Sequence, residues 1–494
     1  MFFGVHSPSV PKGIDMILKP PDKSVVAAGS QDIWQDDILK RSETARSFIK
    51  IIGCRQEAIT MCLNCAWGTG KTFFLTRLCE QYRQTKEPVA GADVGGKAIY
   101  FNAWEDDDLE DPLVAIVGQL WHNLQGGTLE ECVASIKSCA PKLLGKLAVK
   151  VGLGMLKSVP VAGKVVEEFA GGAEPKDLSS ATENVFARYD ELTESKHELK
   201  KRLEELGEKV YSETGRPLLF IIDELDRCRP SFAIETLERV KHLFGVPHIV
   251  FLFGADCEQL KKSVCAVYGD VDAANYLNRF FDIEMSLPSA SNEQFIRMLH
   301  DSHELPDQSS YTCQLHYLLA NLVPLSEIHS LSLRELEKID RVMALIAATN
   351  LASDAEKPVI LPVLAVLKMR NREVYEKVAS GECGYAELID ALYGEVRQDN
   401  LFRRCSNAIR YITIWYTQDS PSNPASAALR AALLRITKSD SLDGIDMSAI
   451  PKTFQSAPFS LLKDCLTAAL SAHGYVQARD SLPIIANALN CIRY

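Results

Sequence analysis

The sequence predicts an α/β fold with a mainly parallel β-sheet, a long helical insertion and a C-terminal α-helical region. Three observations support this fold class. Short apolar runs alternate with segments whose apolar residues recur at helical spacing, a pattern typical of parallel strands that helices cover on both faces. A long charged segment interrupts the alternation. After about residue 289 the strand-like runs stop and Leu-rich helical patterns continue.

Five apolar runs are predicted to form the sheet, namely 58–64, 98–104, 217–222, 248–254 and 281–287. Helices are predicted over residues 35–52, 73–83, 111–124 and 235–244, with a charged helix over about 181–210. The strands lack internal alternation, so they are expected to be buried on both faces, as in a parallel sheet. In the C-terminal region, breaks between helices are predicted near Pro306, Pro324, Pro358 and the Ser/Pro-rich run 419–426.

The order of these elements predicts five parts of the chain. An N-terminal extension covers residues 1–34, and the first part of the α/β core covers 35–125. The helical insertion over 126–210 separates it from the second part of the core, 211–290. The C-terminal helical region then covers 291–494.

Composition restricts the class of protein. Of the 494 residues, 47% are hydrophobic and 24% charged, which is typical of a globular chain. The net charge of −11 gives no overall attraction to nucleic acid or anionic lipid, although a local basic patch stays an open alternative. The 14 cysteines have no framework spacing and no secretory leader precedes them. We therefore expect reduced thiols and a cytoplasmic location.

No apolar run is long enough to predict a membrane span. The longest candidate, 143–166, is interrupted by four lysines and by Pro160. It is interpreted as an amphipathic or partly buried element, and a role at a membrane surface stays open.

A glycine-rich loop lies between the strand 58–64 and the helix 73–83. Its residues are Cys65, Ala66, Trp67, Gly68, Thr69, Gly70, Lys71 and Thr72, and Phe73 follows them into the helix. Glycines let backbone N–H groups surround phosphates, and the next helix offers its N-terminus to the anion. Residues 66–73 are therefore expected to bind a nucleotide, with Lys71 at the β- and γ-phosphates and Thr72 on Mg²⁺. Cys65 stands where a glycine is usual, which leaves the loop geometry in question.

An acidic segment follows the apolar strand 217–222. Asp223 is expected at the end of that strand, where it would hold Mg²⁺. Glu224 is then placed to polarise the attacking water as general base. The alternative is that Glu224, Asp226 and Arg227 form a solvated loop. With the glycine-rich loop, this segment predicts a nucleoside triphosphatase.

Three further residues are candidates for the site. Asp256 follows the strand 248–254 and either senses the γ-phosphate or caps the next helix. Arg279 is either an arginine finger, which adds it to the catalytic candidates Glu224 and Lys71, or a surface residue. Arg334 is either a nucleotide sensor from the helical region or the partner of Glu337 in a surface ion pair.

Four other positions in these motifs are given separate interpretations. Arg227 is expected to pair with a nearby acid rather than with nucleotide. Trp104 is expected to pack in the core, which leaves Asn102 or Glu105 nearer the site.

The chain resembles the KAP family of P-loop NTPases. The residues that carry the resemblance are DDILKR (36–41), AWGTGKT (66–72), FNAW (101–104), DELDR (223–227) and the segments 251–256 and 276–279. It covers roughly residues 36–288, with Glu224 in place of the family's second Asp. The resemblance implies a P-loop NTPase of the additional-strand division, in which an extra strand lies between the phosphate-loop strand and the acidic strand. Family members with a long insertion often carry membrane helices there, so their absence here implies a soluble member of bacterial type.

The resemblance and the motifs together predict an ATPase that binds and hydrolyses Mg²⁺-ATP to drive a conformational switch. The soluble build implies a place in a multi-protein anti-phage defence system, with partner proteins and a homo-oligomer compatible with it. The alternative is a nucleotide-binding signalling scaffold with little or no turnover, suggested by Cys65 and by the Asp–Glu variation. A DNA-translocating ATPase is disfavoured by the acidic charge. ATP is preferred over GTP because no N-K-x-D guanine motif is apparent.

Overall fold

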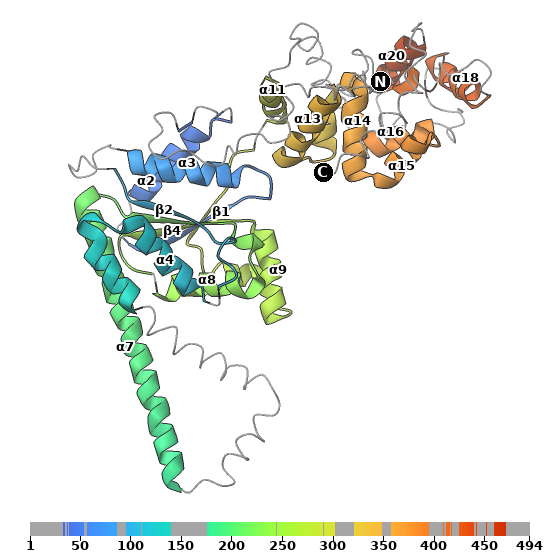
Figure 1. The fold of residues 1–494 in the computed structure, drawn as a ribbon. Helices are drawn as coiled ribbons and strands as arrows, with labels where there is room; N and C mark the ends of the chain where they lie inside the picture. The colour runs from blue at the N-terminus through green and yellow to red at the C-terminus, as the bar shows by residue number, and fades with distance from the viewer. Residues whose placement is uncertain are drawn as a thin grey trace, which may run out of the picture. The chain divides into compact units, whose positions relative to one another are not determined.

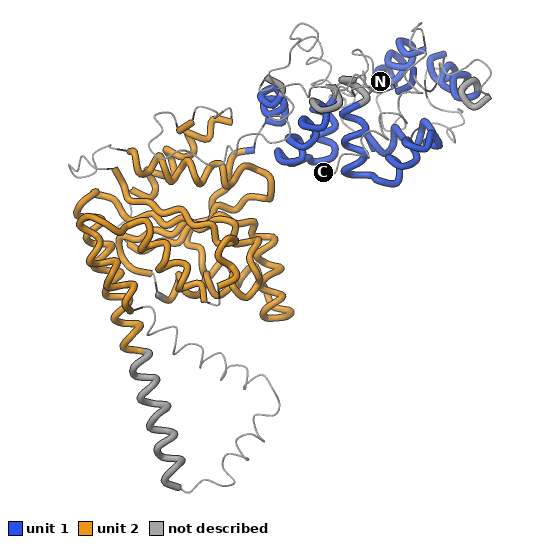
Figure 2. The backbone as a smooth tube through the Cα atoms, viewed as in Figure 1, with its two compact units in different colours: residues 1–21, 289–494 blue, residues 22–288 orange. Residues whose placement is uncertain are grey.

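The computed structural model describes the chain over residues 33–139, 175–301, 321–347, 357–394, 424–438 and 459–470, apart from short gaps at 35–36, 38, 54–56, 86–94, 110, 244 and 290, together with a few single positions between 409 and 451. The predicted N-terminal extension up to residue 32, the lysine-interrupted run 143–166 and the predicted break at Pro306 lie outside these residues. The chain divides into two compact units (Figure 2). One covers residues 22–288, here the α/β unit, and the helical unit contains residues 289–494.

The α/β unit is built on one sheet of five parallel strands (Figure 1). The strands are β1 (Ile59–Asn64), β2 (Ala98–Asn102), β3 (Leu218–Asp223), β4 (Ile249–Ala255) and β5 (Ile283–Met285). Their order in the sheet is β2-β3-β4-β1-β5. Since β4 lies between β1 and β3, the predicted additional-strand arrangement and the predicted parallel sheet are both confirmed.

The strand register brings three carboxyl ends to one edge of the sheet. Asn64 at the end of β1 pairs with Ala255 on β4, and Asp223 at the end of β3 pairs with Gly254. Loops that follow parallel strands leave the sheet at this edge, which is where open α/β folds bind ligands.

Helices cover both faces of the sheet (Figure 1). The helices α2 (Arg41–Gly53) and α3 (Lys71–Gln84) pack on one face, and α4 (Pro112–Leu124), α8 (Pro230–Leu243) and α9 (Cys257–Tyr268) on the other. On β4, Val250 and Leu252 belong to the core beneath α2 and α3, whereas Phe251 and Phe253 belong to the opposite core. Burial on both faces explains why this strand reads as an unbroken apolar run.

The described part of the insertion is mainly one helix. It begins with η1 (Gly127–Leu129) and a helix over 130–139 and ends with the 40-residue α7 (Pro175–Thr214). Leu199, Leu203, Leu206 and Val210 recur at helical spacing along α7 and are buried in the core that it shares with α4 and α8. The insertion is therefore packed onto the sheet unit through the C-terminal half of α7. The predicted charged helix exists and is longer at both ends than 181–210.

Several predicted boundaries are wrong for local reasons. The helix predicted from residue 35 begins at Arg41, because the Asp37 carboxylate accepts hydrogen bonds from the N–H groups of Arg41 and Ser42 and caps it (both 2.7 Å). The helix predicted from 235 begins at Pro230, a residue favoured in the first turn. The last strand is only three residues long.

The described residues of the helical unit contain helices and no strand. They are α11 (Asn292–Asp301), a segment over 321–328, α13 (Leu333–Ala347), α14 (Lys357–Arg370), α15 (Arg372–Ser380), α16 (Tyr385–Tyr393), α18 (Pro424–Lys438) and α20 (Phe459–Leu470). One apolar core joins them. Pro324 lies within the helical segment 321–328, so the break predicted there is wrong, whereas Pro358 stands in the first turn of α14.

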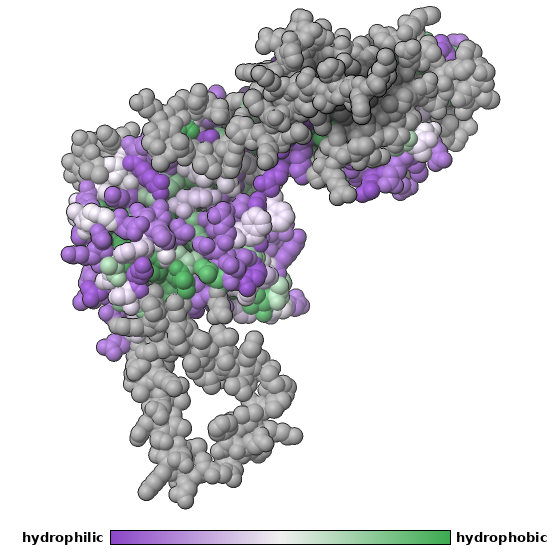
Figure 3. Space-filling view, in the orientation of Figure 1, coloured by the Kyte–Doolittle hydropathy of each residue, from purple (hydrophilic) through white to green (hydrophobic). Residues whose placement is uncertain are grey.

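The visible surface of the α/β unit is mostly hydrophilic, with hydrophobic side chains gathered near α4, α8 and α9 (Figure 3). Its exposed large apolar residues include Val114, Val267, Tyr268 and Val271. Among the residues that the structure describes, no helix combines the length and apolar character needed to cross a membrane.

Candidate nucleotide-binding site

The loop between β1 and α3 has the backbone that its glycines permit. Gly68 and Gly70 have φ of 79° and 86°, in the left-handed region that side chains disfavour. Cys65 is not among the described non-glycine residues with positive φ. Its N–H donates to the Ala255 carbonyl (3.1 Å), and its sulfur accepts from the Leu287 N–H (3.3 Å). Position 65 therefore needs no glycine, and Cys65 in place of the usual glycine is compatible with the geometry of the loop.

The N-terminus of α3 is free to receive an anion. Gly70 supplies no side-chain cap, and the first turn of α3 contains no acidic residue. Backbone N–H groups at such a terminus, together with the helix dipole, favour phosphate. Thr69 closes the loop by donating its hydroxyl to the Ala66 carbonyl (2.9 Å).

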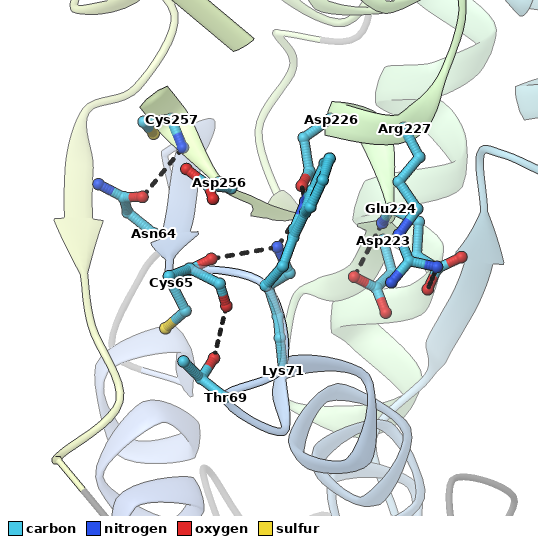
Figure 4. A network of polar contacts seen from close by, with 12 residues as sticks. Asn64, Cys65, Thr69, Lys71, Asp223, Glu224, Asp226, Arg227, Asp256 and Cys257 are labelled. Carbon is cyan, nitrogen blue, oxygen red and sulfur yellow. Dashed lines mark hydrogen bonds and ion pairs between the residues drawn. The ribbon is translucent and has the colours of Figure 1, made fainter. Parts of the chain in front are cut away.

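Lys71 is buried at the centre of the loop (Figure 4). Its ammonium donates to the Cys65 carbonyl (3.4 Å) and pairs with the Asp226 carboxylate (3.5 Å). The lysine thus spans from α3 back across the loop to the turn after β3, where a phosphate-binding lysine is expected.

Asp223 ends β3 and is fully buried. Its carboxylate accepts hydrogen bonds from the Tyr100 hydroxyl (2.9 Å) and the Glu224 N–H (2.8 Å). Burial raises the pKa of Asp223, and the Thr72 hydroxyl, Tyr100 and the Lys71 charge each oppose that rise. The two predicted magnesium ligands, Thr72 and Asp223, are therefore brought into interaction by segments about 150 residues apart.

Gly254 on β4 makes room for this carboxylate, and sequence analysis did not identify it. A Cβ at Gly254 would lie 2.6 Å from the Asp223 Oδ1 atom and closer still to the Leu75 side chain. Distances below 3.0 Å do not occur for real Cβ atoms without displacement of the neighbour. The sequence gives no signal for this role, because the glycine lies within an apolar strand and not in a turn.

Glu224 is buried and held in place by Arg227. Their side chains form an ion pair of 2.8 Å, as expected for an arginine that binds an acid. Burial is the main cause of the raised pKa of Glu224, Asp223 adds to it, and Arg227 and Asn102 lower it. Glu224 also has φ 59°, a left-handed conformation that costs about 1 kcal/mol for a residue with a Cβ.

Trp104 does not pack in the core as expected, since 51% of its surface is exposed. Its ring instead lies over the Arg227 guanidinium, 5.5 Å from the ring centre. Asn102, at the end of β2, lowers the pKa of Glu224 through a side-chain hydrogen bond. Its amide also donates to the carboxylate of the exposed Glu105 (2.8 Å). Asn102 is thus the nearer of the two polar neighbours to the site.

Asp226 is a second residue that sequence analysis did not assign to the site. It is buried, and besides Lys71 it accepts a hydrogen bond from the Trp67 indole N–H. The alternative of a solvated acidic loop is therefore wrong for both Glu224 and Asp226. The available signal was weak, because acids that follow a buried strand are equally typical of exposed turns.

Asp256 lies at the same edge of the sheet (Figure 4) and caps α9. Its carboxylate accepts from the Glu258 N–H (3.0 Å), and the neighbouring Asn64 side chain accepts from the Cys257 N–H (3.0 Å). The helix-cap alternative is thus observed. Asp256 is also buried, and its contact with a γ-phosphate stays a proposal.

The two predicted arginines are both exposed, and they belong to different units of the chain. The Arg279 side chain is exposed and makes no hydrogen bond or ion pair with any described residue, while its carbonyl accepts from Lys241. Arg334 is exposed on α13, in the helical unit. Its suggested pairing with Glu337 is wrong, because Glu337 pairs with Arg341 one turn further on.

The segment around Arg334 has a clear structural role. Ser332 accepts at its hydroxyl from the Glu335 N–H (3.3 Å), and the Glu335 carboxylate accepts from the Ser332 N–H (2.8 Å). This reciprocal capping box starts α13. Its Ser-x-x-Glu spacing is a signal that the sequence already contained.

The residues present fit a magnesium ion that arrives with a nucleotide. Within the described residues no group of three or more His, Cys, Asp or Glu is arranged to hold a metal alone. Mg²⁺ at nucleotide sites takes one or two protein oxygens, phosphate oxygens and water. Thr72 and Asp223 supply two oxygens of that kind.

Comparison with known proteins gives one family match. Residues 41–350, more than half of the chain, match the family described as "KAP family P-loop domain". No match is found among curated protein sequences.

Two solved structures of the Aeropyrum pernix ORC2 protein are similar at a low level. The one with ADPNP-ADP complexes has 12% sequence identity and a TM-score of 0.35, and covers 90% of this chain and 99% of that chain. The ADP form has 12% identity and a TM-score of 0.34, and covers 92% and 98%. Scores this low carry no argument about the present chain.

Proposed function

We propose, for a chain that belongs to the KAP family and contains that family's P-loop domain, that it binds and hydrolyses Mg²⁺-ATP. One observation carries the proposal. The buried Lys71 ammonium lies between the Cys65 carbonyl of the phosphate loop (3.4 Å) and the Asp226 carboxylate of the turn after β3 (3.5 Å), and Asp223 is buried at the end of that strand. A loop, a lysine and a metal-binding acid that converge in this way match the requirements of phosphoryl transfer, which depends on position and charge.

Each group at the site has a separate role in the proposed reaction. The N–H groups of the loop and of the first turn of α3 bind the phosphates, and Lys71 stabilises charge that develops on the γ-phosphoryl group. Glu224 accepts the proton of the attacking water, and its raised pKa suits a general base. Thr72 and Asp223 would hold Mg²⁺, which supplies positive charge between the β- and γ-phosphates when nucleotide is bound.

A nucleotide-binding scaffold with little turnover is the second candidate, and one observation favours it. The Glu224 carboxylate forms an ion pair with Arg227 at 2.8 Å, so the group that would act as general base already has a partner. A protein that keeps this pair after ATP binds would hold nucleotide without hydrolysing it.

Phosphate release from purified protein with Mg²⁺-ATP distinguishes the two candidates. For the enzyme, Glu224→Gln is expected to retain binding and to lose about 10²- to 10³-fold in turnover. Glu204→Gln, the same change at an exposed position of α7, is the matched control and should behave as wild type. ATP binding without turnover in either protein would support the scaffold instead.

The finer role rests on family resemblance alone. We infer that hydrolysis drives a conformational change within a multi-protein anti-phage defence system. Cells that depend on this protein for protection should lose it with Lys71→Ala at equal protein level. Unchanged protection from phage with that variant would contradict the proposed defence role.

A further inference from the structure

Asp226 connects the turn after β3 to the phosphate loop at two points. Its Oδ1 atom pairs with the Lys71 ammonium (3.5 Å; Figure 4). Its Oδ2 atom accepts a hydrogen bond from the Trp67 indole N–H. The Asp226 side chain is 1% exposed and the Lys71 side chain 9%. This is therefore a buried ion pair and not a surface contact.

A buried ammonium group requires a nearby anion. An unpaired charge in a low-dielectric interior is strongly destabilising, and breaking a buried pair leaves that penalty behind. Among the described residues, Asp226 supplies the carboxylate that pairs with the Lys71 ammonium. The β- and γ-phosphates of a bound nucleotide would bring other anionic oxygens to the same ammonium.

We propose that Asp226 is a positioning residue that competes with nucleotide phosphate for Lys71, holding the empty loop in shape and weakening nucleotide binding. The inference rests on the proposed function, since it concerns the same lysine. Nucleotide binding must release Lys71 from Asp226, and release of the product restores the pair.

The fluorescence of Trp67 would report the exchange of Lys71 between Asp226 and phosphate. Its ring is 48% exposed although its N–H is bonded to a buried carboxylate. When phosphate takes Lys71, the charge environment of Asp226 changes and so does that of the indole. The fluorescence of Trp67 is therefore expected to change on ATP addition, and Trp67→Phe should remove that component.

The test is Asp226→Asn, which keeps the shape of the side chain and removes the competing charge. ATP and ADP affinity should rise about tenfold, equivalent to ~1.4 kcal/mol, and AMP affinity should not change, because AMP lacks the phosphates that reach Lys71. The melting temperature without nucleotide should fall, and the rise on adding ATP should exceed that of wild type. A merely structural role would lower stability in both states and would not raise affinity.

Controls separate the outcomes. Asp270→Asn removes the same charge at an exposed position of the same unit and should leave affinity unchanged. Trp67→Phe keeps the charge and loses one of the two contacts, so its affinity gain should be smaller. Equal or weaker ATP binding by Asp226→Asn, with wild type binding normally, overturns this inference alone. If neither protein binds ATP, the proposed function fails with it.

Discussion

At the residue scale, Gly254 sets how closely β4 and α3 approach Asp223. We predict that Gly254→Ala displaces the Asp223 carboxylate or the Leu75 side chain, because the added Cβ would overlap both. Overpacking of this kind costs about 1–3 kcal/mol of unfolding free energy. Where the Asp223 carboxylate is displaced, the Mg²⁺-dependent part of ATP affinity should fall about tenfold, because Asp223 would hold the metal. Titration with ATP in the presence of Mg²⁺ and of a chelator measures this part.

A second glycine serves as the control for that change. A Cβ at Gly118, within α4, meets nothing within 4 Å, so Gly118→Ala should bind ATP as wild type and gain up to about 1 kcal/mol in stability. Wild-type Mg²⁺-ATP affinity in Gly254→Ala would mean that the close approach does not position Asp223.

The residues that sequence analysis identified are those whose chemistry depends on contiguous patterns. Lys71 and Thr72 follow the loop glycines, and Asp223 ends an apolar run, so type and order alone indicate them. Tyr100, Gly254 and Asp226 act through contacts with distant segments. Such contacts depend on strand register and packing, which no local pattern encodes. Trp104 was misplaced for the same reason: a large aromatic residue predicts burial on average, and here a cation holds it at the surface.

At the element scale, the helical unit contains a histidine that ties one helix end to another. The His329 Nε2 atom lies 2.8 Å from the Leu392 carbonyl at the end of α16, which accepts a hydrogen bond from it. Burial lowers the pKa of His329, the bond to Leu392 opposes this, and Arg370 lowers it further. The folded state thus binds a proton less readily than the unfolded chain, whose His titrates near 6.5.

This pKa shift predicts a pH dependence with a definite sign. The stability contribution is complete above about pH 6.5 and is lost as pH falls from there through the lower folded-state pKa. We expect His329→Gln, which keeps a donor and does not titrate, to lose less melting temperature than wild type between about pH 7.5 and 5.5. Thermal melts of both proteins across this range check it. Parallel pH profiles would show that His329 is not linked to folding.

Element types were predictable, and their ends less so. Buried strands are recognised as short continuous apolar runs and amphipathic helices by their period. The start of α2 depends instead on a single cap, Asp37, and the helix begins at Arg41 rather than at the predicted residue 35. The sequence pattern predicts a break at Pro324, which instead lies within the helical segment 321–328. The parallel sheet and its additional strand followed from the apolar runs and from the resemblance, and the family expected from the motifs is confirmed. The family match does not assign the chain to a bacterial branch of the family.

At the scale of the whole molecule, the site residues placed together all lie in the α/β unit, whereas Arg334 lies in the helical unit. Hydrogen exchange measured with and without Mg²⁺-ATP should therefore slow at the loop 65–72 and the turn 223–227. Exchange in α13, which contains Arg334, is measured in the same experiment, and unchanged exchange there would contradict a sensor role for Arg334. Strong protection around Arg334, lost in Arg334→Ala, would instead establish it as a nucleotide sensor.

Equilibrium binding of ATP to the purified full chain, with Mg²⁺, is the measurement that tests the central claim most directly. Lys71 is buried in the phosphate loop and contacts the turn after β3, so the account predicts saturable binding to wild type and a loss of at least about 2–3 kcal/mol of binding free energy in Lys71→Ala. A Lys463→Ala control, on the separate helix α20, should bind as wild type. Equal affinity of wild type and Lys71→Ala, or no binding by a folded wild-type protein, would contradict the account.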